Sequence, residues 1–518
     1  MDTKALRQKI LDLAIRGKLV PQDTNDEPAS VLLEKIREQK QQMFKEGKLK
    51  KKDIKNDSII FKGEDNLHYE KFQDGTVKCI EDEIPFELPE GWAWERLSNL
   101  ALFSGGKTPS TSHSEYWDGD ILWVTSKDMK SKYITSSQLC LSTLGAKQMR
   151  IYQPNTLLLV TRSGILRHTL PVAILKECAT INQDLKAIVL YMPQLAEYIY
   201  VCLKGMEARL LLKYIKSGTT VESVNFDEFQ KVLLPIPPTQ QIDRIISSTG
   251  GTECIVSTIE DSKVALADYV TKAKAKVLDL AIRGKLVPQN PDDEPASILL
   301  ERIRAEKEEL IKQGKIKRDK KESIIFKGED NSYYEKIGDK IENIDDEIPF
   351  ELPDGWGVVR LKELWELISG RDLSPSEYNT DGVGIPYITG ASNFVGGKVE
   401  LVRWTTSPQV ITEIGDLLLT CKGTIGEMAF NDFGSAHIAR QIMAIRNKFT
   451  LNSEYLALCM GFYINAIKNA AKGLIPGISR EDILNLILPV PALNYQAKVV
   501  ERVVEVTNIL SSLEKSLS

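Results

Sequence analysis

The stretch Leu11-Asp-Leu-Ala-Ile-Arg-Gly-Lys-Leu-Val-Pro-Gln22 occurs a second time, without a change, as Leu278-Asp-Leu-Ala-Ile-Arg-Gly-Lys-Leu-Val-Pro-Gln289. Extending the comparison without a gap to Ile36 and Ile303 keeps 21 identities in 26 positions. Chance does not produce such agreement, so a unit of about half the chain has been duplicated. The repeat therefore predicts two related halves in this chain of 518 residues.

Two further segments are repeated. Ser58-Ile-Ile-Phe-Lys-Gly-Glu-Asp-Asn66 recurs at 323–331, and Glu83-Ile-Pro-Phe-Glu-Leu-Pro-Glu-Gly-Trp92 recurs with one change at 347–356. These repeats extend the shared frame to the tryptophan of each half.

The segments after those tryptophans diverge. Residues 93–234 and 357–488 share only weak landmarks, and both then end alike, in Leu234-Pro-Ile-Pro237 and Leu488-Pro-Val-Pro491. The pattern predicts a common frame that carries two variable inserts. The predicted domains are 1–90, 91–239, 240–350, 351–491 and 492–518.

A long apolar seam follows the first insert. As far as Gly284, apolar side chains recur at alternating spacings of three and four, which is typical of a coiled-coil helix. The C-terminus copies the first half of this helix and the N-terminus its second half, so we expect both ends to pair with it in a circular, pseudo-twofold frame with two long antiparallel spacers. A helix of about 44 residues spans ~66 Å, and Gly250-Gly251 predicts a kink or break in it. A long buried helix without a spacer role is the alternative.

A second helix is predicted after each copy of Asp-Glu-Pro-Ala-Ser. Pro28 and Pro295 then stand at the first helical position behind an acidic cap, and the helices end near Gly47 and Gly314. Lysine-rich runs follow: Lys48, Lys50, Lys51, Lys52 and Lys55, and Lys315, Lys317, Arg318, Lys320 and Lys321. They can touch phosphates or acidic surfaces, but a solvated linker explains them at least as well.

Composition excludes several classes of protein. A net charge of −5 excludes a uniformly basic nucleic-acid coat, though not a locally basic face. The seven cysteines form no Cys-x-x-Cys pair and the four histidines are dispersed, so neither a disulfide framework nor a metal cluster is predicted. The N-terminus lacks the apolar core of a signal peptide, and no apolar run approaches the ~20 residues of a membrane span. These features predict a reduced, cytoplasmic protein.

Each insert is predicted to form short strands and glycine turns, followed by helices. The inserts open on Ser104-Gly-Gly-Lys-Thr-Pro-Ser110 and Ser369-Gly-Arg-Asp-Leu-Ser-Pro-Ser376. The Gly-Lys-Thr is no phosphate loop, because Ala101 stands where the first glycine of that motif belongs. Each insert also carries an apolar strand that ends in a cationic turn, at 157–164 and 417–424.

Motifs of a self-contained enzyme are missing from the sequence. There is no Asn-Pro-Pro-aromatic or Asp-Pro-Pro-aromatic tetrapeptide of an amino-methyltransferase, no His-Glu-x-x-His and no Gly-x-Ser-x-Gly. The acidic residues of the frame recur at helix starts, where capping explains them. We therefore expect a recognition protein without its own active site.

The duplicated Leu-Val-Pro-Gln and Asp-Glu-Pro-Ala-Ser frame, the Gly-Gly-Lys-Thr-Pro-Ser opening and the paired Pro-x-Pro exits resemble the specificity subunit of Type I restriction-modification enzymes over essentially the whole chain. The resemblance implies an α/β (mixed α+β) fold in which 91–239 and 351–491 are target recognition domains, each reading one half of a split site in double-stranded DNA. It implies helices that set the half-site spacing and bind two methyltransferase subunits, with restriction (translocase) subunits as further partners. The cofactors would be S-adenosylmethionine on the methyltransferase and ATP and Mg on the restriction subunit, with none on this chain.

The turns of both inserts are rich in side chains that read base edges. Arg and Lys pair with guanine, Asn and Gln with adenine, and Ser and Thr with either. The candidate DNA-binding residues are Lys107, Thr108, Ser110, Ser126, Lys127, Arg162, Ser163 and Gln183 in the first insert, and Arg371, Ser374, Thr389, Ser392, Asn393, Lys422, Thr424, Arg440 and Gln441 in the second. Trp92 and Trp356 are interpreted as core packing at a strand entry.

The two inserts differ in charge. Residues 91–240 hold 16 basic and 12 acidic residues, and residues 355–495 hold 12 and 13. The basic residues of the second insert must therefore be segregated to one face if it binds DNA. Two other functions stay open: a coiled-coil scaffold whose inserts bind proteins, and a self-contained nuclease or methyltransferase with an unrecognised site.

Overall fold

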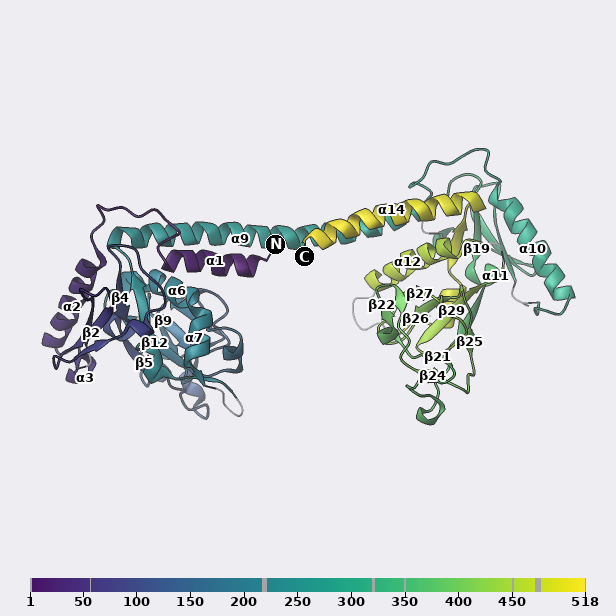
Figure 1. The fold of residues 1–518 in the computed structure, drawn as a ribbon. Helices are drawn as coiled ribbons and strands as arrows, with labels where there is room; N and C mark the ends of the chain where they lie inside the picture. Colours follow the sequence, from purple (N-terminus) through teal and green to yellow (C-terminus); the bar gives the residue numbers. More distant parts are fainter. Residues whose placement is uncertain are drawn as a thin grey trace. The chain divides into compact units, whose positions relative to one another are not determined.

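The computed structural model describes residues 2–55, 57–216, 221–318, 322–348, 351–449, 451–470 and 477–517. The chain divides into two compact units, Met1–Ser262 and Lys263–Ser518, and the division lies inside one helix, α9 (Thr239–Ile282) (Figure 1). Both units combine helices with strands, which confirms the predicted mixed α/β class. In the described ranges, every helix is too short or too polar to cross a bilayer. Two residues of the predicted basic runs, Lys320 and Lys321, lie outside the described residues.

Unit one begins with helices and a small sheet. These elements are α1 (Thr3–Ile15), α2 (Ala29–Lys45), α3 (Lys51–Ile54), β1 (Ser58–Lys62), β2 (His68–Phe72) and β3 (Val77–Cys79). The three strands pair antiparallel in the order β1-β2-β3. Pro28 is the N-cap of α2 and not its first residue, because its ψ of 149° is not helical. The amide of Ala29, the first residue of the helix, donates to the carbonyl of Gly91 at 2.8 Å.

The first insert consists of strands followed mainly by helices, as predicted. Its elements are β4 (Ala93–Arg96), α4 (Leu97–Leu100), β5 (Ala101–Gly105), β6 (Trp117–Val124), β7 (Tyr133–Ile134), β8 (Leu139–Leu141), α5 (Thr143–Ala146), β9 (Leu157–Val160), β10 (Val172–Leu175), β11 (Ala179–Ile181), β12 (Leu185–Leu190), α6 (Ala196–Gly205), α7 (Glu207–Tyr214), β13 (Ile215–Lys216), β14 (Ser223–Val224), α8 (Phe226–Phe229) and β15 (Leu233–Ile236). The main sheet has the order β5-β12-β9-β10-β7. Both faces of β9 are covered: Leu157 and Leu159 share a core with α6, while Leu158 and Val160 share another with β6 and β11. The continuous apolar run of β9 follows from this burial on both sides.

Unit two contains the second copy of the frame and the second insert. Its elements are α10 (Ala296–Lys312), β16 (Ser323–Lys327), β17 (Tyr333–Ile337), β18 (Lys340–Asn343), β19 (Gly357–Arg360), α11 (Leu361–Leu364), β20 (Trp365–Ser369), β21 (Ile385–Ile388), β22 (Phe394–Val395), β23 (Lys398–Val399), β24 (Trp404–Thr405), β25 (Ile411–Thr412), β26 (Leu417–Thr420), β27 (Met428–Phe430), β28 (Ala436–Ile438), β29 (Ile442–Asn447), α12 (Ser453–Ala470), α13 (Arg480–Leu484), β30 (Ile487–Val490) and α14 (Leu493–Leu517). Its main sheet, β20-β29-β26-β27, matches β5-β12-β9-β10, and the parallel pair β21–β28 matches β6–β11. The inserts therefore share a topology although their sequences have diverged.

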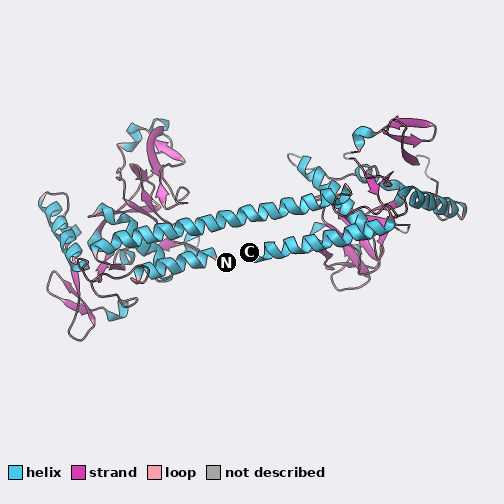
Figure 2. Ribbon diagram, turned by 90° about the horizontal axis from the view of Figure 1, so that it is seen from above, coloured by secondary structure: helices cyan, strands magenta, loops and turns pink. Residues whose placement is uncertain are grey.

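In unit one, α1 lies beside the first part of α9 (Figures 1 and 2). Arg7 donates to Glu253 at 2.9 Å and to Glu260 at 2.6 Å, and Asp26, beyond the end of α1, pairs with Arg244. Residue numbers rise along α1 as they fall along α9, so the two helices are antiparallel.

In unit two, α14 packs against the rest of α9. Lys274 pairs with Glu514 at 2.7 Å, while Tyr495, at the other end of α14, donates to the carbonyl of Val287 at 2.7 Å. These contacts again describe an antiparallel pair, and the side chain of Val503 is buried in it.

Helix α9 continues through Gly250 and Gly251, so the predicted break is wrong. Each glycine costs a helix ~1 kcal/mol relative to alanine. Ile245 and Val256 on either side are fully buried, and their packing offsets that cost. Farther along the predicted seam, Val270 is buried but Leu266 is exposed.

The repeated frame residues pack on one another. Gly17 has a φ of +66°, and a Cβ at this position would lie 2.5 Å from Cγ of Pro89. Gly284 and Pro353 repeat both values in unit two. Only glycine fits such a site, because it alone combines left-handed backbone with so close a neighbour.

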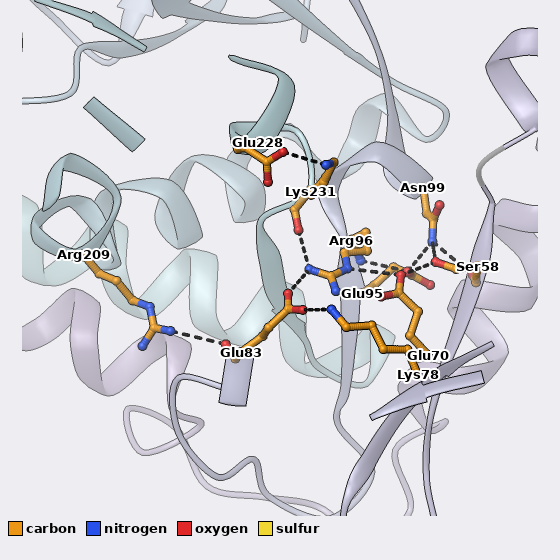
Figure 3. Close-up of polar contacts among 10 residues, drawn as sticks. All are labelled: Ser58, Glu70, Lys78, Glu83, Glu95, Arg96, Asn99, Arg209, Glu228 and Lys231. Atoms are coloured by element: carbon orange, nitrogen blue, oxygen red, sulfur yellow. Dashed lines mark hydrogen bonds and ion pairs between the residues drawn. The ribbon is translucent and has the colours of Figure 1, made fainter. Parts of the chain in front are cut away.

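A buried ion cluster fixes the small sheet of unit one to the first insert (Figure 3). Arg96 of β4 donates to Glu70 of β2 at 2.7 Å, to Glu83 at 2.8 Å and to the carbonyl of Lys231 at 2.8 Å. Burial raises the pKa of Glu83, but the hydrogen bonds and charges of Arg96 and Lys78 outweigh this effect and hold the pKa at about 2. The cluster therefore ties β2 of the sheet to β4 of the insert.

Unit two repeats this cluster. Arg360 of β19 donates to Glu335 of β17 at 2.7 Å, to Glu347 at 2.8 Å and to the carbonyl of Asn485 at 2.8 Å. The sheet β16-β17-β18 is thus tied to the second insert in the same way.

Candidate nucleic-acid interface

One end of the main sheet in the first insert carries a polar turn built on a close backbone approach. Gly106 directly follows β5, and a Cβ there would stand 2.0 Å from the carbonyl oxygen of Ile181. The next amide, that of Lys107, donates to the same carbonyl at 3.0 Å. The glycine lets the turn cross the end of the sheet and leaves the side chain of Lys107 exposed.

Further predicted residues gather at this end of the sheet. Because β12 pairs with both β5 and β9, the turn before β12 and the turn after β9 meet here. Gln183 stands in the first of these turns and accepts a hydrogen bond from Thr108 Oγ1. Arg162 stands in the turn after β9. The amide of the residue before it, Thr161, donates to the carbonyl of Asp184 at 2.8 Å. The side chains of Lys107, Arg162 and Gln183 are all exposed.

The other candidates of the first insert divide into exposed and structural residues. Ser126 and Lys127 follow β6, whose last residue pairs in parallel with the last residue of β11, and the side chain of Lys127 is exposed. Ser163 caps a helical turn, since its Oγ accepts from an amide two residues later. Ser110 lies in an exposed loop, 2.7 Å from Oγ of Ser112.

The second insert repeats the arrangement with other side chains. Gly370 follows β20, and a Cβ there would lie 2.1 Å from the carbonyl oxygen of Ala439. The amide of Arg371 donates to the carbonyl of Ile438 at 2.9 Å, as that of Lys107 does to Ile181. The strand-end turn is therefore the same device in both inserts.

These backbone contacts define equivalent positions. We call Lys107, Arg162 and Gln183 the first sheet-end triad, and Arg371, Lys422 and Arg440 the second. All six side chains are exposed. The structure thus brings together six of the predicted residues, three on each insert, and the residue types at equivalent positions differ.

An acidic residue lies within the second sheet-end triad. Asp372 accepts from Nε of Arg440 at 2.6 Å and from its amide at 3.1 Å. Gln441, with its amide oriented to donate, lies 3.2 Å from Asp372 Oδ1 and 3.1 Å from the carbonyl of Thr389. Exposed ion pairs of this kind contribute about 0–1 kcal/mol, so Arg440 exchanges Asp372 for another acceptor at small cost.

Asn393 is a correction to the predicted site. Its side chain is fully buried, where Oδ1 accepts from the amide and hydroxyl of Thr389 at 3.0 and 3.1 Å and Nδ2 donates to the carbonyl of Glu400 at 2.8 Å. A side chain with these partners shapes its loop and presents nothing to a base.

Three candidates remain in the second insert. Ser374 caps a helical turn through Glu377, which accepts from its hydroxyl at 2.6 Å. Ser392 and Thr424 are exposed, and Thr424 shares the turn of Lys422.

Sequence reasoning missed two residues of the second insert. Asp372 directly follows Arg371 in the sequence, and an acidic residue next to a candidate basic residue could have predicted an ion pair at this site. Arg480 donates to the carbonyl of Leu367 at 2.6 Å and lies 3.2 Å from Oγ of Ser369, at the end of β20. No local pattern marks Arg480, since it is 111 residues away from Ser369 in the sequence.

Trp92 and Trp356 pack partly buried against the two main cores, which confirms the prediction made for them. Among the residues that the structure describes, no three His, Cys, Asp or Glu side chains are grouped to hold a metal ion.

The chain matches one family model in two places. Residues 89–249 and 353–518 match the Type I restriction modification DNA specificity domain. Each matched segment covers one insert and the helical segment that follows it.

Several known proteins are similar over long stretches. The chain is 25% identical to the Type I restriction enzyme EcoEI specificity subunit of Escherichia coli, over 99% of this chain and 90% of that protein. It is 27% identical to the EcoAI specificity subunit of the same species, over 73% of this chain and 65% of that protein. One solved structure comes from a study of complex assembly and conformational transition of the type I R-M system. It aligns with a TM-score of 0.54 and 17% identity, over 84% of this chain and 94% of that chain. This last likeness shows the fold alone.

Proposed function

Because the chain belongs to the Type I restriction modification DNA specificity domain family, we propose that it is the DNA specificity subunit of a Type I restriction-modification complex. It recognises a bipartite, asymmetric site in double-stranded DNA, with one half read by each insert. The chain supplies recognition, and its partners supply catalysis.

The observation that carries this proposal is the pair of sheet-end triads. Both inserts expose three polar side chains at one end of the main sheet in equivalent positions, Lys-Arg-Gln in one and Arg-Lys-Arg in the other. Lysine and arginine suit guanine, whereas glutamine suits adenine. Equal geometry with unequal side chains is what two different half-sites require.

The helices of the frame suit the role of spacers. Helix α9 has 44 residues and is therefore ~66 Å long. Half-sites about one turn of DNA apart, ~34–36 Å, lie within that reach. The antiparallel pairs α1–α9 and α14–α9, together with the tiling of the repeated sequence, support a circular, pseudo-twofold frame with two spacers.

Two methyltransferase subunits and the restriction subunits complete the proposed assembly in the cytoplasm. S-adenosylmethionine belongs to the methyltransferase, and ATP and Mg belong to the restriction subunit. The near-neutral second insert supports this division, because partner subunits then supply much of the phosphate contact that DNA binding needs.

Methylation mapping tests the proposal. The chain is expressed with and without its neighbouring methyltransferase subunit, and modified adenines in host DNA are sequenced. We expect a split, asymmetric motif only when both proteins are present. No motif from a verified soluble complex would favour the scaffold function, and methylation or cleavage by the chain alone would favour the enzyme.

Exchanging residues 93–234 for a foreign insert tests the division of labour. We expect one half-site to change and the other to stay. A change in both half-sites would contradict modular reading.

A further inference from the structure

The small sheets β1-β2-β3 and β16-β17-β18 each have one face that points away from the ion cluster. Side chains alternate across a strand, so residues paired between strands share a face. In unit one, Ile59 pairs with Lys71 and Phe61 with Tyr69. These four residues lie opposite the face of Glu70, which binds Arg96 of the insert.

The second sheet presents the same four residue types in the same register. Ile324 pairs with Lys336 and Phe326 with Tyr334. We call the two sets of four residues the outer sheet faces. Each has an aromatic stack, with ring centroids 5.9 Å apart for Phe61–Tyr69 and 6.0 Å apart for Phe326–Tyr334.

The apolar side chains of the outer sheet faces are exposed. The exposed fraction is 46% for Ile59 and 41% for Phe61, and it is 40% for both Ile324 and Phe326. Val77 and Ile341, on the third strands, add exposed apolar surface next to the lysines. Such half-exposed groups gain little from folding, and contiguous patches of them mark interaction sites.

Ser58–Asn66 is repeated without change at 323–331, inner-face residues included, and the two sheets differ mainly after it. Position pairs that differ include Leu67 and Ser332, His68 and Tyr333, Phe72 and Ile337, and Lys78 and Glu342, and the turns between the second and third strands differ in length. Yet the isoleucine, phenylalanine, tyrosine and lysine of the outer sheet faces are identical. Folding permits polar residues at exposed positions, so apolar side chains that stay exposed in both copies mark a surface that a partner can cover.

We propose that each outer sheet face docks one copy of the same partner protein, the methyltransferase subunit. This inference rests on the proposed function, which supplies a partner that is present twice. Two identical faces on one chain fit two identical subunits, whereas the inserts differ because they read different half-sites.

The charge of the outer sheet faces defines the matching surface. Lys71 and Lys336 are exposed, and neither has an acidic partner within 4.0 Å among the residues that the structure describes. The partner then offers a carboxylate within an apolar surface. Nucleic acid fits less well, because binding to phosphates requires several cations and gains nothing from isoleucine.

The ion clusters connect each proposed docking surface to one insert. Arg96 and Glu70 fix the first sheet to the first insert, and Arg360 and Glu335 fix the second sheet to the second insert. A methyltransferase held on a sheet therefore keeps a constant distance from the insert that reads its half-site. Such positioning is what delivers the enzyme to one base.

Each outer sheet face is a part of a larger interface. The strands have three to five residues, the longest of them ~17 Å long, and lie ~4.8 Å apart, so each sheet offers at most on the order of 200 Å². A stable interface takes ~800 Å² from each partner. Substitutions on one face should therefore weaken docking and not abolish it.

The test uses the full chain titrated with the purified methyltransferase subunit. One variant combines Phe61→Ser with Lys71→Glu, a second combines Phe326→Ser with Lys336→Glu, and a third carries all four changes. Leu212→Ser is the matched control, since Leu212 is 89% exposed and lies on α7, outside the outer sheet faces. Circular dichroism and thermal melting check that every variant is folded.

We expect two equal sites in the wild type and in the Leu212→Ser control. Each two-residue variant should keep one site and weaken the other by about 10- to 100-fold, as for interface residues that carry binding energy. The four-residue variant should weaken both. A folded four-residue variant that titrates like the wild type would overturn the inference while leaving the proposed function intact.

Two other outcomes are informative. If the four-residue variant binds methyltransferase normally but its complex loses affinity for DNA, the outer sheet faces bind nucleic acid and the inference is wrong. If the wild-type chain binds no methyltransferase at all, the proposed function fails, and the inference fails with it.

Discussion

The indole nitrogen of Trp92 donates a hydrogen bond to Oε1 of Gln22 at 3.1 Å, across 70 residues of sequence. Nε2 of Gln22 in turn donates to the carbonyl of Gly17 at 2.6 Å. Unit two repeats the first contact at 3.1 Å between Trp356 and Gln289. The repeated motifs therefore contact one another, and a change in one motif would leave a polar group of another without its hydrogen-bond partner.

Replacing Gly17 with alanine should destabilise unit one. A left-handed φ costs alanine about 1–2 kcal/mol, and the clash with Pro89 adds about 1–3 kcal/mol of overpacking. Gly47→Ala is the matched control, because Gly47 has a φ of +71° but no atom within 4 Å of the place that a Cβ would take. Urea unfolding should show the larger loss of stability for Gly17→Ala, and equal losses would show that Pro89 does not crowd this position.

Removing Arg96 should unfold the junction between the small sheet and the first insert. Arg96→Ala leaves Glu70, which is 4% exposed, without its buried partner, and such losses cost about 3–5 kcal/mol. Lys78→Ala removes an exposed partner of Glu83 and should cost at most about 1 kcal/mol. Denaturant titrations of both variants compare the two costs, and a similar small effect for each would show that the cluster does not hold the sheet.

The stability of unit one should depend on pH through Glu95. Burial raises its pKa to about 7, despite a hydrogen bond from Asn99 at 2.7 Å and the charge of Arg37 at 3.6 Å. The folded protein then holds a proton that the unfolded chain releases between pH 4.5 and 7. The free energy of unfolding therefore falls as pH rises through this window, by roughly 3 kcal/mol in all.

Glu95→Gln should remove that part of the pH dependence. Melting temperatures of the wild type and the variant should be closest near pH 4.5, and the variant should be relatively more stable above pH 7. Identical pH profiles would show that Glu95 is ionised in the folded protein across the window.

Substitutions in the two sheet-end triads should act on separate half-sites. Arg162→Ala should relax specificity in one half of the DNA motif, and Lys422→Ala should do so in the other, by about 1–3 kcal/mol for a lost base contact. Methylation mapping of complexes with each variant reads both halves at once. If DNA binding instead weakens equally for all sequences and its affinity depends less on salt, the side chain contacts a phosphate.

Repetition and periodicity predicted much of the fold. The identical twelve-residue segments predicted two related units, and strand-like runs such as 157–160 are strands in the structure. The Gly250-Gly251 break was wrong, because the buried neighbours Ile245 and Val256 keep the helix continuous. Local propensity is a weak term when tertiary packing opposes it.

The candidate site was predicted only as residue types in turns. Strand register decides that Lys107, Arg162 and Gln183 share one end of a sheet, and burial decides that Asn393 faces inward. Neither fact is visible in the sequence around those residues.

The sequence by itself determined the duplication, the mixed class and the division into frame and inserts, because these are patterns of neighbouring residues and of repeated segments. Only the tertiary structure decided which turns meet, which polar groups are buried and which sheet faces stay exposed. Those properties depend on contacts between residues far apart in the chain, such as Arg96 with Glu70 and Arg480 with Leu367. A local pattern carries no record of such contacts, since register and burial are set by the packing of whole elements.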